Sequence, residues 1–137
     1  MARPIIGIIS NQHTINNEYE VQAAGLINIS AVADVADGLP LLIPAEPDSV
    51  HLNDLLTHCA GFVFTGGRAN VHPEEYGEEE TPAHGTFDRK RDGIALPLIR
   101  DDAGTVIGAL GVTGDTSDND VITAQAGVAA AGLVAEI

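Results

Sequence analysis

Polar side chains and glycines follow the short apolar runs of the chain, and these positions are the first candidates for chemistry. Two groups stand out as candidate ligand-binding residues: Asn11, Gln12 and His13, and then Gly66, Gly67 and Arg68. If the apolar runs form parallel strands, their carboxyl ends share one edge of a sheet, which is where such folds bind ligands. Ordinary loop polarity also explains the first group, and a tight turn also explains the two glycines.

Cysteine chemistry is a second possibility, and Cys59 is the only cysteine of the chain. One cysteine excludes a disulfide framework and a thiolate zinc site. A nucleophilic thiol needs a neighbouring base and an electropositive setting, and His58 is its immediate neighbour in the sequence. Because adjacent residues of a helix point apart, we expect His58 not to reach the thiol. We interpret Cys59 as a small buried apolar residue.

Metal binding is a third possibility, raised by two acid-rich segments. His72 and His84 share a loop with five glutamates, but their spacing matches no metal motif, and a solvated loop explains the charges. The aspartates of the second segment lack the glycine and the distal glutamate of a calcium loop, and helix capping accounts for them: Asp115, Asp118 and Asp120. We therefore predict neither a metal nor a cofactor.

The order of the apolar segments indicates an alternation of strands and helices that would position these residues. Continuous apolar runs predict buried strands at 4–10, 40–44, 61–65 and 106–112. Helical spacing and capping residues predict helices at about 16–38, 48–58, 85–99 and 118–135. Strands without polar alternation, each followed by a helix, favour a mostly parallel sheet of about four strands with helices on both faces. Right-handed connections make this a doubly wound α/β fold.

The chain is acidic, with 20 Asp and Glu against 6 Lys and Arg and a net charge of −14 over 137 residues. It has no basic stripe to neutralise phosphates, so we expect neither nucleic acid nor an anionic membrane as a partner. No apolar run approaches the ~20 residues of a spanning helix, and no signal peptide is evident, so we expect a cytoplasmic protein. We expect the one basic cluster, 89–91, to pair with the acidic loop before it.

Four segments within residues 1–100 carry a family resemblance. They are 3–8, 38–44, 65–78 and 88–92, and the third, with its Thr-Gly-Gly, His-Pro and Tyr-Gly pairs, is the most specific. Together they resemble the amino-terminal part of the gamma-glutamyl-gamma-aminobutyrate hydrolases, which are class I glutamine amidotransferase-like enzymes. The resemblance implies a flavodoxin-like three-layer α/β/α fold, hydrolysis of a gamma-glutamyl amide bond, and a small gamma-glutamyl compound as ligand. It also implies that the turn 66–68 supplies backbone N–H donors to an oxyanion.

The catalytic residues that this resemblance implies do not occur in these 137 residues. The family uses a Cys-His-Glu triad, with the cysteine on a Gly-Ile-Cys-Arg-Gly elbow after the 85–99 helix and the other two residues much later. The sequence has no such elbow, and no histidine follows His84. Thr113 comes nearest to the nucleophile position, but no histidine is available to deprotonate it. We therefore predict a truncated domain that is inactive by itself.

Residues 101–137 differ in composition and resemble a second family. They contain no His, Lys, Arg or aromatic residue, and the segment 102–120 resembles the carboxy-terminal end of the small haem-binding and glycolate-operon accessory proteins. We therefore predict a chimera, with a partial amidotransferase-like domain at 1–100 and a strand-turn-helix segment at 101–137 that completes it. Small residues along the 118–135 helix suit close packing. The alternative function is thus a non-catalytic module that forms a homo-oligomer through this helix or binds a haem-type ligand.

Overall fold

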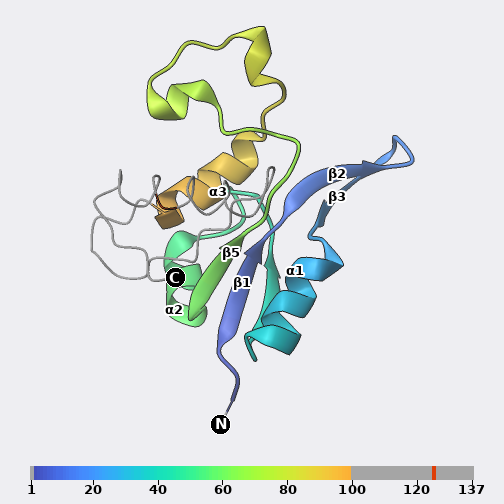
Figure 1. Cartoon of the computed structure of the whole chain (residues 1–137), viewed down its shortest axis with the longest axis vertical. Coiled ribbons are helices and arrows are strands. Elements are labelled where there is room, and N and C mark those ends of the chain that lie inside the picture. Colours follow the sequence, from blue (N-terminus) through green and yellow to red (C-terminus); the bar gives the residue numbers. More distant parts are fainter. Residues whose placement is uncertain (1, 100–124, 126–137) are drawn as a thin grey trace.

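The sheet is parallel in the computed structural model, which describes residues 2–99 and residue 125. Its described strands are β1 (Ile5–Ile9), β4 (Leu39–Ile43) and β5 (Gly61–Phe64), in the order β4-β1-β5 (Figure 1). Ile9 at the end of β1 is level with Ile43 and with Phe64. Three of the predicted strands are therefore confirmed, and their carboxyl ends meet at one edge of the sheet. The predicted burial of the second was wrong, because β4 leaves Leu39, Leu41 and Leu42 40–47% exposed.

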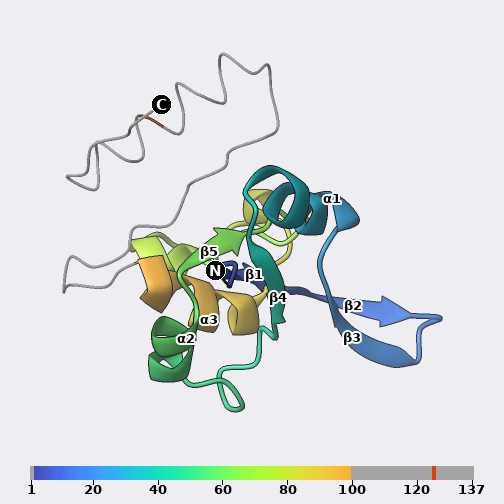
Figure 2. The same ribbon diagram turned by 90° about the horizontal axis from the view of Figure 1, so that it is seen from below.

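Helices cover both faces of this sheet, as Figure 2 shows. One face carries α2 (Leu52–His58) and α3 (Arg89–Ile99), and the other carries α1 (Leu26–Ser30), which continues as a π-helical segment, η1 (Ala31–Val35). The main core lies between the sheet and α2 and α3, and its buried members are Ile9, Ile43, Leu55, Cys59, Phe62, Ile94 and Leu98. The predicted α/β class is confirmed: the layers are those of a flavodoxin-like fold.

A β-hairpin replaces the first half of the helix that we predicted from residue 16. Its strands are β2 (Asn11–Ile15) and β3 (Tyr19–Ala23), which pair antiparallel and project away from the sheet (Figure 1). Asn16 and Asn17, which we interpreted as a helix cap, have φ angles of 53° and 56°. Two successive left-handed residues form the tight turn whose twist matches a hairpin, and asparagine tolerates that conformation. The helix prediction was therefore wrong before Leu26.

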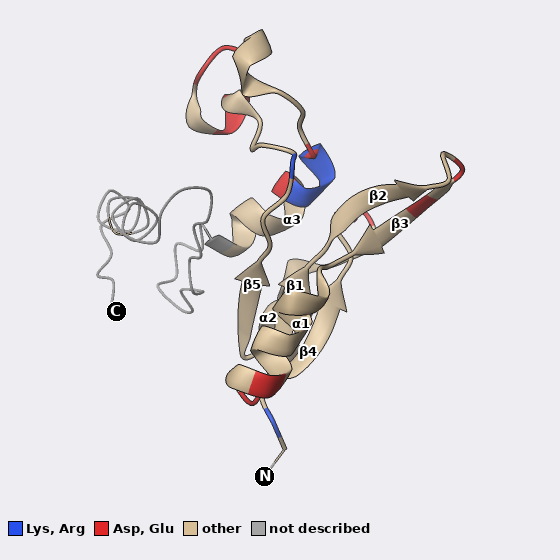
Figure 3. Cartoon of the chain, turned by 45° about the vertical axis from the view of Figure 1, so that its right-hand side comes forward, with Lys and Arg blue, Asp and Glu red and all other residues tan. Residues whose placement is uncertain are grey.

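The acidic loop between β5 and α3 contains two 3-10 helices, η2 (Pro73–Tyr76) and η3 (Pro82–His84). It returns to the body of the protein at a parallel bridge between Asn70 and Phe87. In Figure 3 the acidic stretches of this loop, coloured red, lie above the blue basic start of α3. The loop leaves and re-enters the fold beside the carboxyl end of β5, so it borders the edge where the candidate residues lie.

Two further helices begin later than the sequence predicts. A turn in which Ser49 and Val50 donate to the carbonyl of Glu46 precedes α2, which delays its start from residue 48 to Leu52. Asp88 accepts a 2.9 Å hydrogen bond from the backbone N–H of Arg91 and so acts as the N-cap of α3. These local hydrogen bonds form in place of those of an earlier helical turn, so both helices begin later than predicted.

Several predictions fall outside the described residues. They concern the strand at 106–112, the helix at 118–135, Thr113, and the aspartates at 115, 118 and 120. The division of the chain at residue 100 and self-association through the last helix therefore stay predictions. Within residues 2–99, no helix has the length and apolar character needed to cross a membrane.

Candidate functional site

One cavity of about 780 Å3 gathers all six candidate residues at the carboxyl edge of the sheet. The start of β2 supplies Asn11, Gln12 and His13, and the segment after β5 supplies Gly66, Gly67 and Arg68. The rest of the described lining consists of Ala23, Gly25, Asn28, Ala69 and Thr86. The two groups meet because β1 and β5 are neighbouring parallel strands, so the segments that follow them leave the sheet side by side.

Asn11 and Thr65 connect the ends of the two strands. The Thr65 hydroxyl donates to the carbonyl of Ile9 at 2.7 Å and accepts from Asn11 Nδ2 at 2.8 Å. Asn11 Nδ2 also lies 3.3 Å from the carbonyl oxygen of Gly66, to which it donates. The amide of Asn11 is thus used in holding the turn after β5, whereas we had predicted it only as a polar group of the crevice.

Arg91 of α3 is a member of this network that the sequence did not reveal. Its Nη1 donates to Asn11 Oδ1 and its Nη2 donates to the carbonyl of Ala69, both at 2.6 Å. We had expected the whole basic cluster to pair with the acidic loop, and this holds only for Arg89, which contacts Glu74 at 3.0 Å. Lys90 instead pairs with Glu46 at 2.8 Å, and this hydrogen bond raises the pKa of Lys90. The spacing of these residues in the sequence does not reveal that each has a different partner.

The two glycines of the turn differ in the space around them. A Cβ atom on Gly66 would meet nothing within 4 Å. A Cβ atom on Gly67 would lie 2.7 Å from Arg91 Nη1 and 2.9 Å from Asn11 Oδ1. The Arg91–Asn11 contact therefore occupies the space that a side chain at residue 67 would need.

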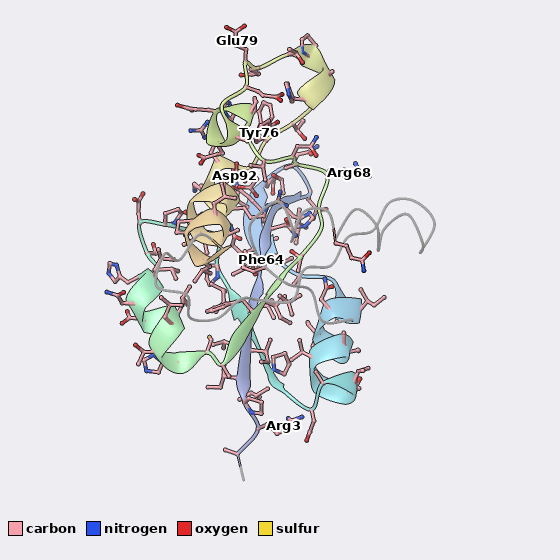
Figure 4. All side chains as sticks on the ribbon, turned by 60° about the vertical axis from the view of Figure 1, so that its left-hand side comes forward. Arg3, Phe64, Arg68, Tyr76, Glu79 and Asp92 are labelled. Atoms are coloured by element: carbon pink, nitrogen blue, oxygen red, sulfur yellow. The ribbon has the colours of Figure 1, made fainter. Side chains whose placement is uncertain are left out.

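The described lining of the cavity contains no acidic residue, although the chain is strongly acidic. None of its described lining residues is Asp or Glu. Arg68 lies on this lining, just beyond Phe64 at the end of β5 (Figure 4), and its guanidinium has no acceptor among residues 2–99. Arg89, Lys90 and Arg91 all have acceptors. Among residues 2–99, the site therefore offers a positive charge without an acceptor, an imidazole and amides to an anionic ligand.

Cys59 lies away from this cavity, in the core below α2. Burial raises the pKa of its thiol, which is the opposite of what a nucleophilic cysteine requires. The side chain of His58 meets the carbonyl of Asp54 at 2.8 Å, in the preceding turn of α2. The interpretation of Cys59 as a buried apolar residue agrees with this geometry.

We expect the native chain to react with a small thiol reagent at pH 8 at least about tenfold more slowly than the chain unfolded in urea. Burial both excludes the reagent and keeps the Cys59 thiol protonated. Absorbance of the released chromophore under both conditions provides the measurement. Equal rates would show that the thiol is accessible and ionised, contrary to its placement in the core.

Among residues 2–99, no cluster of three or more His, Cys, Asp or Glu side chains could hold a metal ion. His72 instead lies between two glutamates, with Nδ1 3.9 Å from Glu74 and Nε2 3.6 Å from Glu80, and His84 Nε2 lies 3.8 Å from Glu78. The backbone N–H of His72 donates to the buried carboxylate of Asp92 at 3.1 Å, which ties the acidic loop to α3.

The family model described as Peptidase C26 matches residues 4–114, which include every described residue of the cavity and extend past residue 100. No individual curated protein matches the chain significantly.

Proposed function

The chain belongs to the Peptidase C26 family of glutamine amidotransferase-like hydrolases, and we propose that its cavity binds a gamma-glutamyl amide such as gamma-glutamyl-gamma-aminobutyrate. One observation carries the proposal: Asn11–His13 and Gly66–Arg68 line one cavity at the carboxyl edge of a parallel sheet, and none of its described lining residues is acidic. The family match supports a glutamine amidotransferase-like hydrolase, and the resemblance of segment 65–78 is the ground for choosing a gamma-glutamyl compound as the ligand.

The residues of the cavity suggest how such a ligand would lie. The backbone N–H groups at Gly66 and Gly67 would donate to the carbonyl oxygen of the gamma-amide, and the exposed glycines leave that approach open. The guanidinium of Arg68 would pair with a carboxylate of the ligand, because it has no competing acceptor among residues 2–99. Gln12 and His13 would add neutral hydrogen bonds from the hairpin side.

We propose that these 137 residues bind the amide without cleaving it. Hydrolysis in this family requires a thiolate activated by histidine, and the only thiol is the buried Cys59. The oxyanion donors stabilise charge only after a nucleophile has attacked the carbonyl. Donors without a nucleophile therefore form a binding site rather than a catalytic one.

Titration with gamma-glutamyl-gamma-aminobutyrate, followed by calorimetry or amide NMR shifts, tests the binding proposal. We expect saturable binding that Arg68→Gln weakens about tenfold, the effect of one charged hydrogen bond. Arg3→Gln is the matched control, because Arg3 is also exposed and has no acceptor among residues 2–99, but does not line the cavity. No saturation, or equal weakening by both substitutions, would refute the site.

Release of glutamate from the same compound tests the proposed inactivity. We expect no turnover above the buffer rate. The matched variant is Cys59→Ala, which removes the only thiol of the chain. Turnover that this substitution abolishes would contradict the claim that the chain binds without cleaving.

A further inference from the structure

We propose that Arg91 is a positioning residue, which fixes the Gly66–Ala69 turn and thereby the direction of its N–H donors into the cavity. The inference builds on the proposed function, because the turn matters as part of that ligand site. Arg91 is not on the cavity lining and acts only through Asn11 and Ala69.

The guanidinium holds two segments at once. One nitrogen donates to Asn11 at the start of β2, and the other donates to the carbonyl of Ala69 in the turn after β5. Asn11 connects Arg91 to the start of the turn, because its own amide donates to the Thr65 hydroxyl and to the Gly66 carbonyl. Arg91 of α3 therefore holds the end of the turn directly and its start through Asn11.

The chemistry of the two acceptors distinguishes Arg91 from its neighbours. Arg89 and Lys90 are exposed and pair with carboxylates, whereas half-buried Arg91 donates to two neutral oxygens. A guanidinium presents its donors in a rigid planar fork, so it can serve two acceptors in fixed directions. A lysine ammonium keeps the charge but has no such fork, and Arg91→Lys is therefore the informative substitution.

The test compares the full chain with its Arg91→Lys variant. In amide NMR spectra we expect the signals of Gly66, Gly67 and Ala69 to shift, while those of β4 stay in place. Binding of gamma-glutamyl-gamma-aminobutyrate should weaken about tenfold, which corresponds to one lost charged hydrogen bond. Arg89→Lys is the matched control, because it makes the same change two residues earlier, at an exposed salt bridge. It should change neither the amide signals of the turn nor the affinity for gamma-glutamyl-gamma-aminobutyrate.

A second variant keeps the test decisive if Arg91→Lys lowers stability. Asn11→Asp leaves an acceptor for Arg91 but removes the donor to Thr65 and Gly66, so it should shift the same turn signals. Unchanged turn signals in both variants would overturn the role of Arg91 even if the wild-type chain binds the probe. Absence of wild-type binding would instead refute the proposed function, and the turn signals would still decide the role of Arg91.

Discussion

Ile94→Ala should lower the free energy of unfolding by about 2–5 kcal/mol, the usual range for truncating a buried aliphatic side chain. Ile94 is 1% exposed and lies in the core that joins α3 to the sheet. The loss combines the transfer free energy of the removed atoms with the cavity that they leave. Urea denaturation followed by circular dichroism measures the change.

Ile27→Ala is the control for this substitution, since it removes the same atoms from a helix of the opposite layer. Ile27 is 80% exposed, so its truncation should change the free energy of unfolding by less than about 0.5 kcal/mol. A loss at Ile94 as small as the one expected at Ile27 would mean that α3 does not pack on the sheet as described. Because α3 carries Arg91, such a result would also weaken the argument for the site.

Gly67→Ala should cost about 1–3 kcal/mol, the usual cost of inserting a group into occupied space. The new methyl group would lie 2.7 Å from Arg91 Nη1 and 2.9 Å from Asn11 Oδ1, and these two atoms are joined by a hydrogen bond. Both atoms end flexible side chains, so they can move, but only by breaking their 2.6 Å hydrogen bond. Urea denaturation and the amide signals of residues 65–69 report the effect.

Gly66→Ala provides the matched comparison one residue away. Nothing lies within 4 Å of a Cβ at this position, and neither glycine has a positive φ angle, so alanine should be tolerated within about 0.5 kcal/mol. The cost at residue 67 should largely disappear when Arg91 is alanine, because the nearer obstructing atom is then gone and the side chain of Asn11 can turn away without breaking its hydrogen bond to Arg91. A cost that persists in that double variant would assign the glycine requirement to the backbone rather than to the Arg91 contact.

The strands and the location of the site were predictable from the sequence for a simple reason. A continuous apolar run is typical of a strand in a parallel sheet, and the segments at 4–10, 40–44 and 61–65 show such runs, although Leu41 and Leu42 of the second are exposed in the structure. Parallel pairing then places the residues after them at one edge, whatever the details of the loops. Asn11–His13 and Gly66–Arg68 could therefore be assigned to the same edge without coordinates, and the cavity unites them.

The hairpin was missed because its sequence satisfies two patterns equally well. Residues 19–24 have apolar positions that fit either a helix or a strand, and an Asn pair can cap a helix or form a tight turn. The choice depends on the environment, and in the structure β2 and β3 pair with each other and leave the sheet. Periodicity within a short window carries no information about that pairing.

The amino-acid sequence by itself determined the apolar strands, their parallel arrangement, the edge that carries the ligand-binding candidates and the burial of Cys59. These properties follow from local composition, because the hydrophobic effect acts on each segment in much the same way wherever it packs. Only the tertiary structure decided the hairpin, the different partners of Arg89, Lys90 and Arg91, and the unequal space at Gly66 and Gly67. Those depend on hydrogen bonds between residues such as Asn11 and Arg91, far apart in the chain, whose geometry exists only once the layers have packed.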